Sequence, residues 1–481
     1  MKEPEKGISK EDIREYFERI ADRRMVWKKR NRFYHRSLEK YFSFIIPAGS
    51  RVLEVGCGTG DLLAAVKPEF GVGIDFSGKT IELAASRHTH LHFKVHDIES
   101  DTFIEQLDQD KQQFDYIILS DLLHVLWDVQ KALHNIRKFC HPSTRIIISN
   151  YNFLWEPVLR FGEFIGLKQK SPNPNWLSYN DIVNLLEIEG FQVLTNSQKL
   201  ILPKYIPLLN FLFNKILVNL PVLNHLGLLN IISARIYMPQ RKEHSVSIVI
   251  PARNEKGNIP SAITRTPVFG KSQEFIFVEG HSSDGTYEEM LKVSSSSPDK
   301  NIKVMKQQGK GKGDAVRMGF DAATGDILMI LDADLTTPPE DLPKFYNAIA
   351  DGQGEFINGC RMVYPMEKEA MRFLNLIGNK FFSQFFSYLL GQRLKDTLCG
   401  TKVLFKSDYE KIKANRSYFG DFDPFGDFDL LFGAAKLNLK IVEIIVRYKE
   451  RQYGSTQISR FRHGFLLLRM SMFAAFKLKF R

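Results

Sequence analysis

A short apolar segment, Arg51 to Val55, leads directly into Gly56-Cys57-Gly58-Thr59-Gly60 and then into a second apolar stretch. Three glycines at alternate positions let the backbone turn tightly and let a ligand approach it closely. The N-terminus of a following helix favours carboxylates and other anionic groups. The pattern therefore predicts a strand, a ligand-binding loop and a helix in succession.

Acidic residues end the next two predicted strands. Asp75 follows one strand, 21 residues after Glu54, and Asp97 follows the next. An acid at the first place can accept hydrogen bonds from ribose hydroxyls, and one at the second can bind an adenine amino group. Strand and helix patterns alternate, which indicates parallel strands with helical crossovers. The strands predicted in this half are residues 51–55, 71–74, 91–95, 114–119 and 145–149.

These residues resemble the class I S-adenosylmethionine-dependent methyltransferases over about residues 12 to 240. The matching segments are LEVGCGTGDLL, GVGIDFS, HDIE and FDYIILSDLLHVLWD. The resemblance implies S-adenosylmethionine as the cofactor, with the methionine end on Glu54 and the glycines, the ribose on Asp75, and the adenine on Asp97. The implied cofactor-binding residues are Glu54, Gly56, Gly58, Gly60, Asp75, Phe76, Asp97 and Ile98.

The methyl-acceptor pocket of this family is built from the N-terminal helix and later segments. Nothing in the spacing of the candidate side chains selects one as catalytic, and a structural role is equally open for each. A domain that binds the cofactor without transferring a methyl group also stays open. The candidates are Tyr16, Tyr34, His124, Tyr151 and Trp155.

The second half contains another alternation of strands and helices, with strands predicted at 245–250, 275–278 and 326–331. The last of these ends in Asp332-Ala333-Asp334. Two carboxylates two residues apart at a strand end can bind Mg²⁺ or Mn²⁺, which would neutralise a diphosphate leaving group. An Asp pair that only caps the strand is the alternative.

Three longer segments in this half resemble the family 2 glycosyltransferases with the GT-A fold, from residue 246 to about 463. They are VSIVIPARNEKGNI, FIFVEGHSSDGTYE and GKGKGDAVRMGFDAATGDILMILDADLTTPPEDL. The match is greatest with the branch that transfers mannose or glucose to dolichyl or polyprenyl phosphate. The resemblance implies a UDP- or GDP-sugar donor and a polyprenyl-phosphate or glycan acceptor.

The resemblance also implies a set of site residues. Nucleotide-sugar binding falls to Pro251, Asn254, Glu255, Glu279, Lys312, Asp332, Ala333 and Asp334, of which Asp332 and Asp334 would hold the metal. Phosphate or acceptor binding is assigned to Arg361, Arg372 and Arg451, because one arginine guanidinium can bind two phosphate oxygens at once. Glu279 stands where the family usually has Asp, which leaves the base preference open.

The catalytic residues implied are Asp334, Asp396 and Asp427. An acid near the anomeric carbon can act as a general base, and the sequence does not decide between Asp396 and Asp427, which has Asp429 close by. A phosphate acceptor is already anionic and needs little deprotonation. Arg451 opens a late motif whose usual terminal lysine is replaced by Gln457; Arg460 and Arg462 follow closely and can supply the charge.

Two segments could meet a membrane. Residues 440–481 hold ten Lys and Arg against two Glu, and the apolar, basic end of the chain suits an interfacial helix. That end and the aromatic segment 381–390 could equally be core helices. The apolar segment 200–238 carries Pro221 within its longest uncharged run, so we expect buried or membrane-surface structure and not a spanning helix.

Composition bounds the remaining classes. With 481 residues, 44% hydrophobic and 25% charged, the chain suits two or three globular domains and excludes a disordered, collagen-like or polytopic membrane protein. Four cysteines far apart and an N-terminus without an apolar core predict a cytoplasmic protein, peripheral at most at the cytoplasmic face of the membrane.

The sequence therefore predicts an α/β protein of two Rossmann-like domains, a methyltransferase domain at residues 1–237 and a glycosyltransferase domain at 246–481, joined by a linker at 238–245. The leading hypothesis is a bifunctional enzyme that makes or modifies a glycan or glycolipid. A glycosyltransferase with a non-catalytic cofactor-binding domain is the alternative. A nucleic-acid-binding protein is disfavoured, because no RNA motif is present and the expected pockets are acidic.

Overall fold

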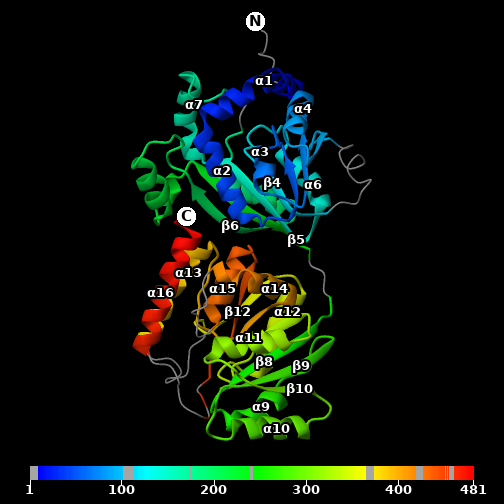
Figure 1. The fold of residues 1–481 in the computed structure, drawn as a ribbon, viewed down its shortest axis with the longest axis vertical. Helices are drawn as coiled ribbons and strands as arrows, with labels where there is room; N and C mark the ends of the chain where they lie inside the picture. The colour runs from blue at the N-terminus through cyan, green and yellow to red at the C-terminus, as the bar shows by residue number, and fades with distance from the viewer. Residues whose placement is uncertain are drawn as a thin grey trace. The chain divides into compact units, whose positions relative to one another are not determined.

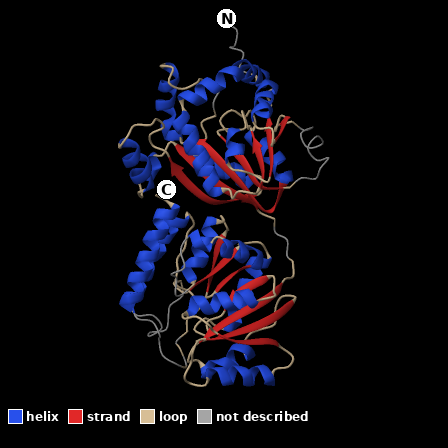
Figure 2. Ribbon diagram, viewed as in Figure 1, coloured by secondary structure: helices blue, strands red, loops and turns tan. Residues whose placement is uncertain are grey.

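The chain forms two compact units, Met1–Met238 and Pro239–Arg481. The computed structural model describes residues 9–100, 113–172, 175–238, 242–363, 373–418, 426–449, 451, 453 and 460–480. Each unit is a β-sheet flanked by helices (Figure 2). The predicted fold class, two Rossmann-like α/β domains, is confirmed.

The first unit is built on a seven-stranded sheet in the order β3-β2-β1-β4-β5-β7-β6. Figure 1 labels β4, β5 and β6 of this sheet. The first five strands of this order are parallel, and β7 is antiparallel to both β5 and β6. The strands are β1 (Arg51–Val55), β2 (Phe70–Asp75), β3 (His92–Val95), β4 (Phe114–Ser120), β5 (Cys140–Tyr151), β6 (Phe191–Lys199) and β7 (Leu229–Ile236).

Alternate residues of the central strands feed two apolar clusters. Leu53 and Val55 belong to one cluster and Val52 to the other, so both faces of the sheet are buried. The helices that cover these faces are α1 (Lys10–Arg30), α2 (Arg32–Ile45), α3 (Asp61–Ala65), α4 (Gly78–Arg87), α6 (Val129–Ile136), α7 (Glu156–Phe164) and α8 (Tyr179–Ile188). The parallel strands place the carboxyl ends of β1, β2 and β4 at one edge.

The sequence did not reveal β6 and β7. All eight residues of β7 are buried, although Asn230, Ser233 and Arg235 interrupt its apolar pattern. Part of the segment expected to be buried or membrane-surface structure is therefore a strand inside the sheet. Residues 205–209, which precede it, are exposed.

The second unit has a mixed seven-stranded sheet in the order β10-β9-β8-β11-β13-β12-β14. β10, β9, β8 and β11 are parallel, and β13 is antiparallel to its neighbours β11 and β12. The strands are β8 (Ser245–Ala252), β9 (Ser272–Glu279), β10 (Asn301–Lys306), β11 (Ile327–Ile330), β12 (Phe356–Cys360), β13 (Lys402–Phe405) and β14 (Ile441–Ile445).

Helices again cover the sheet, and the last of them completes the core. Leu467, Met470 and Ala474 of α16 join Phe386 of α13 in one apolar cluster, so one face of each helix is core. The helices are α9 (Ile259–Thr264), α10 (Thr286–Ser296), α11 (Lys312–Ala322), α12 (Leu342–Ala350), α13 (Phe373–Leu390), α14 (Lys406–Ala414), α15 (Asp427–Lys436) and α16 (Arg460–Leu478). Within the described part of the chain, none of these or the other helices is both long and apolar enough to cross a bilayer.

The close packing of α11 on β8 can be tested with a pair of glycines. A Cβ on Gly319 would lie 2.3 Å from Cγ1 of Val249, whereas one on Gly378 of α13 would meet nothing within 4 Å. We expect Gly319→Ala to lower the free energy of unfolding by about 1–3 kcal/mol through overpacking. Gly378→Ala should raise it by about 0.5–1 kcal/mol through helix propensity. Urea unfolding, monitored by hydrogen exchange in peptides of this unit, measures the free energy of unfolding of both variants. Equal effects of the two substitutions would contradict the close packing at Gly319.

Candidate functional site

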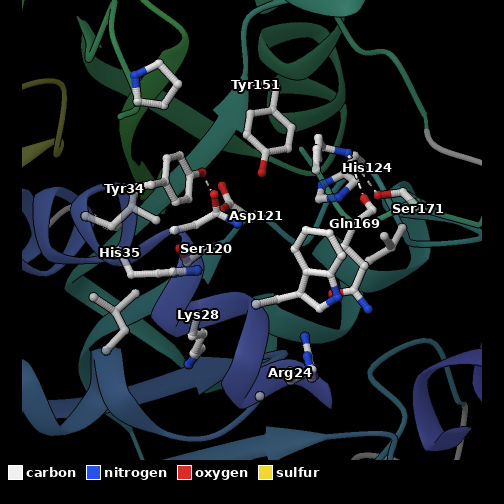
Figure 3. Close-up of a pocket in the computed structure, with 18 of the residues that line it drawn as sticks. Arg24, Lys28, Tyr34, His35, Ser120, Asp121, His124, Tyr151, Gln169 and Ser171 are labelled. Atoms are coloured by element: carbon white, nitrogen blue, oxygen red, sulfur yellow. Dashed lines mark hydrogen bonds between the residues drawn. The ribbon is translucent and has the colours of Figure 1, made fainter. Parts of the chain in front are cut away.

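The first unit has a cavity of about 1190 Å³ above the carboxyl ends of β1, β2 and β4. Residues of α1, α2 and α7 close it from the other side. Figure 3 shows Tyr34, Tyr151 and His124 on one side of this cavity and Lys28 and Arg24 on the opposite side. Five of the predicted cofactor-binding residues line it: Glu54, Gly56, Gly58, Asp75 and Phe76.

Asp75 organises the glycine loop. Its Oδ2 accepts a hydrogen bond of 3.0 Å from the backbone N–H of Gly58, and its Oδ1 accepts one of 3.0 Å from Ser77. Gly56 and Gly58 have φ of +71° and +53°, a conformation that favours glycine. The carboxylate thus holds the loop in the shape that the sequence pattern predicted.

Glu54 and Gly60 support the loop from below. Oε2 of Glu54 accepts a hydrogen bond of 3.0 Å from the N–H of Leu63, and burial raises the pKa of this carboxyl to about 8. Gly60 begins α3 with φ of +74°, and a Cβ there would lie 2.6 Å from the ring of Phe93. Gly60 is not among the residues that line the cavity.

A second, smaller cavity of about 40 Å³ shares Gly56, Asp75 and Phe76 with the first. Asp97 and Ile98 line it, as expected for a site that extends from Asp75 to the third strand. Asp97 is also paired with Lys10 of α1, whose Nζ lies 2.6 Å from its Oδ2.

Arg24 is a site residue that the sequence did not reveal. It projects from α1 to the glycine loop, with Nη1 3.9 Å from Oδ2 of Asp75. This nitrogen is buried and has no hydrogen-bond partner. Lys28, one turn later, binds Asp61 at 2.7 Å and fixes α1 over the loop. A buried guanidinium nitrogen without a hydrogen-bond partner is suited to bind a carboxylate of a ligand.

Asp121 lies on the opposite side of the cavity, just after β4. Its Oδ2 accepts a 2.6 Å hydrogen bond from Oη of Tyr34, and its Oδ1 accepts a 3.0 Å bond from Oγ of Ser149. Burial raises the pKa of Asp121 to about 6 despite these bonds. The φ of Asp121 is +50°, a strained conformation of the kind found at functional sites.

His124 and Tyr151 complete this polar group. Their rings lie 5.4 Å apart, and Nδ1 of His124 is buried without a hydrogen-bond partner. Burial lowers the pKa of His124 to about 3, so the ring is neutral at physiological pH. Tyr16 and Trp155 also line the cavity, but their polar atoms donate to the backbone oxygens of Lys170 and Leu226, at 2.5 and 2.9 Å.

The structure thus selects among the five acceptor candidates, which sequence spacing could not do. Tyr34 binds Asp121, which follows β4 and was not predicted as a site residue, and the rings of Tyr151 and His124 continue the group from Tyr34. The available signal for Asp121 was its position: β4 neighbours β1, so its end must face the glycine loop.

In the second unit the predicted metal motif lies at the end of β11. Nζ of Lys312 is 2.5 Å from Oδ1 of Asp332. Burial opposes the charge on each group, yet the pair holds the pKa of Asp332 below its usual range and that of Lys312 above it. Gly400 faces this pair, and a Cβ there would lie 2.0 Å from Oδ2 of Asp332. Ala333, between the two acids, is buried.

Arg451 joins two predicted site residues that are far apart in sequence. Its Nη2 is 2.7 Å from Oδ2 of Asp334, and its Nη1 is 2.9 Å from Oε1 of Glu255. Burial raises the pKa of Glu255 to about 7, although Arg451 acts in the opposite direction. Thr336 donates a 2.9 Å hydrogen bond to Oδ1 of Asp334.

The predicted nucleoside-binding residues gather at the ends of β8 and β9. Pro251 lies in β8, and Asn254 follows with φ of +55° and accepts a 2.9 Å hydrogen bond from the N–H of Ser283. Glu279 ends β9, is buried and accepts a hydrogen bond from the N–H of Ser282.

The two candidate bases are held differently. Asp396 is fully buried, and Arg361 binds it through Nε at 2.7 Å and Nη2 at 2.9 Å, while Asn379 adds a 2.9 Å bond. Burial alone would raise its pKa, but the Arg361 guanidinium holds it at about 2. Asp427 begins α15, and its Oδ1 lies 3.2 Å from Nζ of Lys402 without a hydrogen bond.

Some predicted positions are not described. Arg372 and Gln457 lie outside the described residues, as do the side chains of Arg460 and Arg462. Asp429, the acidic neighbour of Asp427, is paired with Arg416 at 3.1 Å.

Asp332 and Asp334 are a pair and not a complete ligand set. The described side chains of His, Cys, Asp and Glu form no group of three that could hold a metal ion. Two hard carboxylates nevertheless fit Mg²⁺ or Mn²⁺, because such ions take their other ligands from water and substrate phosphates.

Comparison with known families matches each unit separately. A model described as "Glycosyl transferase family 2" matches residues 247–412, and one described as "Methyltransferase domain" matches residues 26–196. The chain joins a methyltransferase domain to a family 2 glycosyltransferase domain. Both family resemblances drawn from the sequence motifs are therefore confirmed.

Curated relatives match the glycosyltransferase domain. The undecaprenyl-phosphate 4-deoxy-4-formamido-L-arabinose transferases of Salmonella paratyphi B and Salmonella newport are 34% identical over 139 residues. The match covers 27% of this chain and 42% of each relative, so the chain spans less than half the length of these relatives.

Solved structures resemble each domain more distantly. A methyltransferase from Thermotoga maritima, described as a possible histamine N-methyltransferase, is 17% identical with a TM-score of 0.36, covering 46% of this chain and 99% of its own. Glucosyl-3-phosphoglycerate synthase from Mycobacterium tuberculosis, in complex with Mn²⁺ and UDP, is also 17% identical with a TM-score of 0.36. This match covers 49% of this chain and 80% of the synthase.

The Arg361–Asp396 pair allows a stability test. We expect Asp396→Asn to lower the free energy of unfolding of the glycosyltransferase domain by about 3–5 kcal/mol at neutral pH, because it leaves a buried guanidinium uncompensated. The folded pKa is depressed, so this stabilisation is present above the unfolded value of about 4 and is lost as pH falls through 2. The difference in the free energy of unfolding between the unaltered protein and Asp396→Asn should therefore decrease over that pH range.

The control is an equally well-formed pair at the surface. Arg265 binds the half-exposed Glu340 at 2.8 and 2.9 Å, and Glu340→Gln should cost less than about 1 kcal/mol. Urea unfolding at several pH values, followed by hydrogen exchange in peptides of this domain, measures both variants. A similar cost for the two would show that Asp396 is not the buried anchor of Arg361.

Proposed function

We propose that the chain is a bifunctional transferase: its second domain transfers a sugar from a UDP- or GDP-sugar to a polyprenyl phosphate or glycan, and its first domain transfers a methyl group from S-adenosylmethionine in the same pathway. The observation that carries the proposal is that each family match coincides with a group of charged residues suited to that chemistry. The alternative, a non-catalytic first domain, is disfavoured by the polar group around Asp121, which a purely cofactor-binding module does not need.

In the methyltransferase domain, binding and proton transfer fall to different residues. S-adenosylmethionine, when bound, supplies an electrophilic methyl group. Asp75 and the glycine loop would bind its ribose and methionine end, with Arg24 on the methionine carboxylate, and Asp97 would lie toward the adenine. The partnerless Nη1 of Arg24 and the open loop fit such a ligand.

Asp121 would orient the acceptor and take its proton. A carboxyl with a pKa near 6 is ionised at neutral pH and still basic enough to share a proton. Tyr34 holds this carboxylate in place, and His124 and Tyr151 offer further polar contacts to the acceptor. Positioning supplies the rest of the rate enhancement.

In the glycosyltransferase domain, cations and a divalent metal would stabilise the diphosphate. Asp332 and Asp334 would hold Mg²⁺ or Mn²⁺, which withdraws charge from the leaving group when it is bound. Lys312 and Arg451, which neutralise these acids, are cations suited to contact phosphate oxygens. Pro251, Asn254, Glu255 and Glu279 would bind the nucleoside.

Asp396 is better suited to position Arg361 than to act as a base. A carboxyl with a pKa near 2 that is bound to a guanidinium has little tendency to take a proton. Arg361, in turn, would bind the phosphate of the acceptor or donor. Asp427 is the better candidate base for a hydroxyl acceptor, whereas a phosphate acceptor would need none.

We also propose a cytoplasmic location with peripheral contact to the membrane. The four cysteines are free and buried, which suits a reducing compartment. The exposed face of α16, with Met472 and Phe476 beside Arg469, suits a membrane surface.

Release of nucleoside diphosphate tests the glycosyltransferase proposal. The purified chain with Mn²⁺ would be offered UDP- and GDP-sugars, with and without undecaprenyl phosphate. We expect release from one donor to increase with the lipid phosphate. Asp334→Asn should reduce it by at least about a hundredfold, because the metal supplies several kcal/mol of charge stabilisation.

The exposed Asp299, between α10 and β10, provides the control for this assay. Asp299→Asn changes the net charge by the same amount and should leave release unchanged. If the release of nucleoside diphosphate does not increase with undecaprenyl phosphate, the acceptor would be a soluble glycan and not the lipid phosphate. Equal activity in Asp334→Asn and Asp299→Asn would contradict the metal site.

Titration calorimetry with S-adenosylmethionine tests the first domain. We expect Asp75→Asn and Arg24→Gln each to weaken binding by about tenfold or more, because each removes a charge-assisted hydrogen bond. Glu82→Gln, on the exposed side of α4, is the control and should bind like the unaltered protein. Absence of binding in the unaltered protein would contradict the cofactor, and full affinity in both site variants would contradict the placement.

A further inference from the structure

The methyltransferase domain exposes an unusual amount of apolar side chain around its cavity. In and after α7, Phe161 is 60% exposed and Phe164 84%. In the segment before β7, Leu208 is 84%, Phe211 59% and Val222 77% exposed. We call these five residues, with Ile165, the apolar surface. Apolar patches of this kind mark interaction sites in proteins that otherwise bury such residues.

Basic residues border the apolar surface, and acids are scarce there. Residues 200–238 contain no Asp or Glu, and residues 23–36 contain seven Lys and Arg and no acid. The two segments meet where Nζ of Lys204 donates to the backbone oxygen of Arg30 at 3.2 Å, and where the rings of Phe33 and Tyr205 lie 5.6 Å apart.

The cations along this border are available to solvent. Lys29, Arg30, Arg32 and Arg36 are exposed on α1 and α2, and so is Lys215 beside Phe211. The acids on α7 are already neutralised: Glu156 binds Arg160 at 2.6 Å, and Glu163 binds Lys168. The field over the apolar surface is therefore positive.

Part of this surface, at Phe161 and Ile165, also lines the cavity. Val26, Val158, Phe161, Ile165 and Leu167 line the cavity and also have exposed side chains. Further in, the lining becomes polar at Tyr34, Asp121 and His124 (Figure 3). A molecule that enters would thus pass apolar side chains before its reactive group reaches Asp121.

We propose that the apolar surface and its basic border dock the methyltransferase domain on an anionic membrane, and that its methyl acceptor is a lipid-anchored molecule. The polar head of that molecule enters the cavity to Asp121, while its lipid chain stays among the apolar side chains and the bilayer. The inference rests on the proposed methyltransferase activity and names the class of its acceptor.

Charge favours a membrane over another occupant. Apolar side chains flanked by Lys and Arg, without acids, match the acyl boundary and the phosphate groups of an anionic leaflet. A second copy of the chain would bring the same positive charge to the interface and be repelled. The apolar residues lie in α7 and just after it, and in short helical and irregular segments between β6 and β7, and these segments can enter the headgroup layer without disturbing the sheet.

Vesicle co-sedimentation of the full chain tests the docking. The probes are vesicles of phosphatidylcholine alone and of phosphatidylcholine mixed with phosphatidylglycerol. We expect binding to the mixed vesicles that weakens as salt rises. The double variant Phe164→Asp/Leu208→Asp should reduce this binding by about tenfold or more, because it removes two apolar anchors and adds two negative charges.

A matched control separates docking from general surface chemistry. Val268 is 88% exposed in the glycosyltransferase domain, and Val268→Asp should leave sedimentation unchanged. Unchanged binding in the double variant would overturn the proposal. So would light scattering that shows a dimer in the unaltered chain and a monomer in the double variant, because the surface would then join two copies.

The acceptor class has its own test. The chain and S-adenosylmethionine with a labelled methyl group would be given the organic-phase and aqueous-phase extracts of the cells that make the protein. Label in the organic phase, lost in Tyr34→Phe and lowered in the double variant, supports a lipid-anchored acceptor. Label in the aqueous phase alone overturns it.

The result distinguishes this inference from the proposed function. If neither extract is labelled and calorimetry shows no binding of S-adenosylmethionine, the methyltransferase activity itself is wrong. If the cofactor binds with the same affinity to the unaltered chain and the double variant, a loss of vesicle binding reports on docking alone.

Discussion

In both domains a carboxylate stands at the carboxyl end of a central strand, buried at Asp75 and partly buried at Asp332, and its removal from water obliges the chain to supply it with donors or cations. Asp75 takes two backbone N–H groups and so shapes the glycine loop of the first domain. Asp332 forms an ion pair with Lys312, and Asp334 forms one with Arg451, which also pairs with Glu255. The form of each site follows from how its acids are neutralised.

The two solutions suit two kinds of ligand. Neutral N–H groups leave Asp75 with its charge, so the first site can accept hydrogen bonds from hydroxyls and needs only Arg24 for a carboxylate. Lysine and arginine neutralise the acids of the second site. A diphosphate could replace the acids as the partner of these cations, and its metal could replace the cations as the partner of the acids. Burial acts to raise the pKa of Asp332, but Lys312 lowers it, and the charges of Lys402 and Arg361 add to that effect.

The surface of the methyltransferase domain around its cavity differs in polarity from the site inside. The cavity is polar near Asp121 and apolar at Phe161 and Ile165, and cations border the apolar surface. That gradient matches an amphiphilic acceptor, which a polyprenyl-linked product of the second domain would also be. The surface proposed for membrane contact is separate from the end of the chain, where the sequence predicted such contact and where α16 uses one of its faces for the core.

Sequence alone determined the features that depend on neighbours along the chain. The strand, glycine loop and following acid, and the strand that ends in Asp332 and Asp334, are local patterns whose periodicity is set by backbone geometry. They were enough to predict both folds and both families, and they named candidate residues for each site. Strands such as β7 escaped detection because a central strand may carry polar residues that pair only within the assembled sheet.

Tertiary structure alone decided which distant side chains meet. Tyr34 and Asp121 are 87 residues apart, and Arg451 and Glu255 are 196 apart, so no spacing rule could join them. Folding likewise placed Arg24, whose Nη1 has no hydrogen-bond partner, over the glycine loop, and it brought Asp396 to Arg361. The reason is physical: burial changes the charge state and partners of a side chain, and burial is a property of the packed fold.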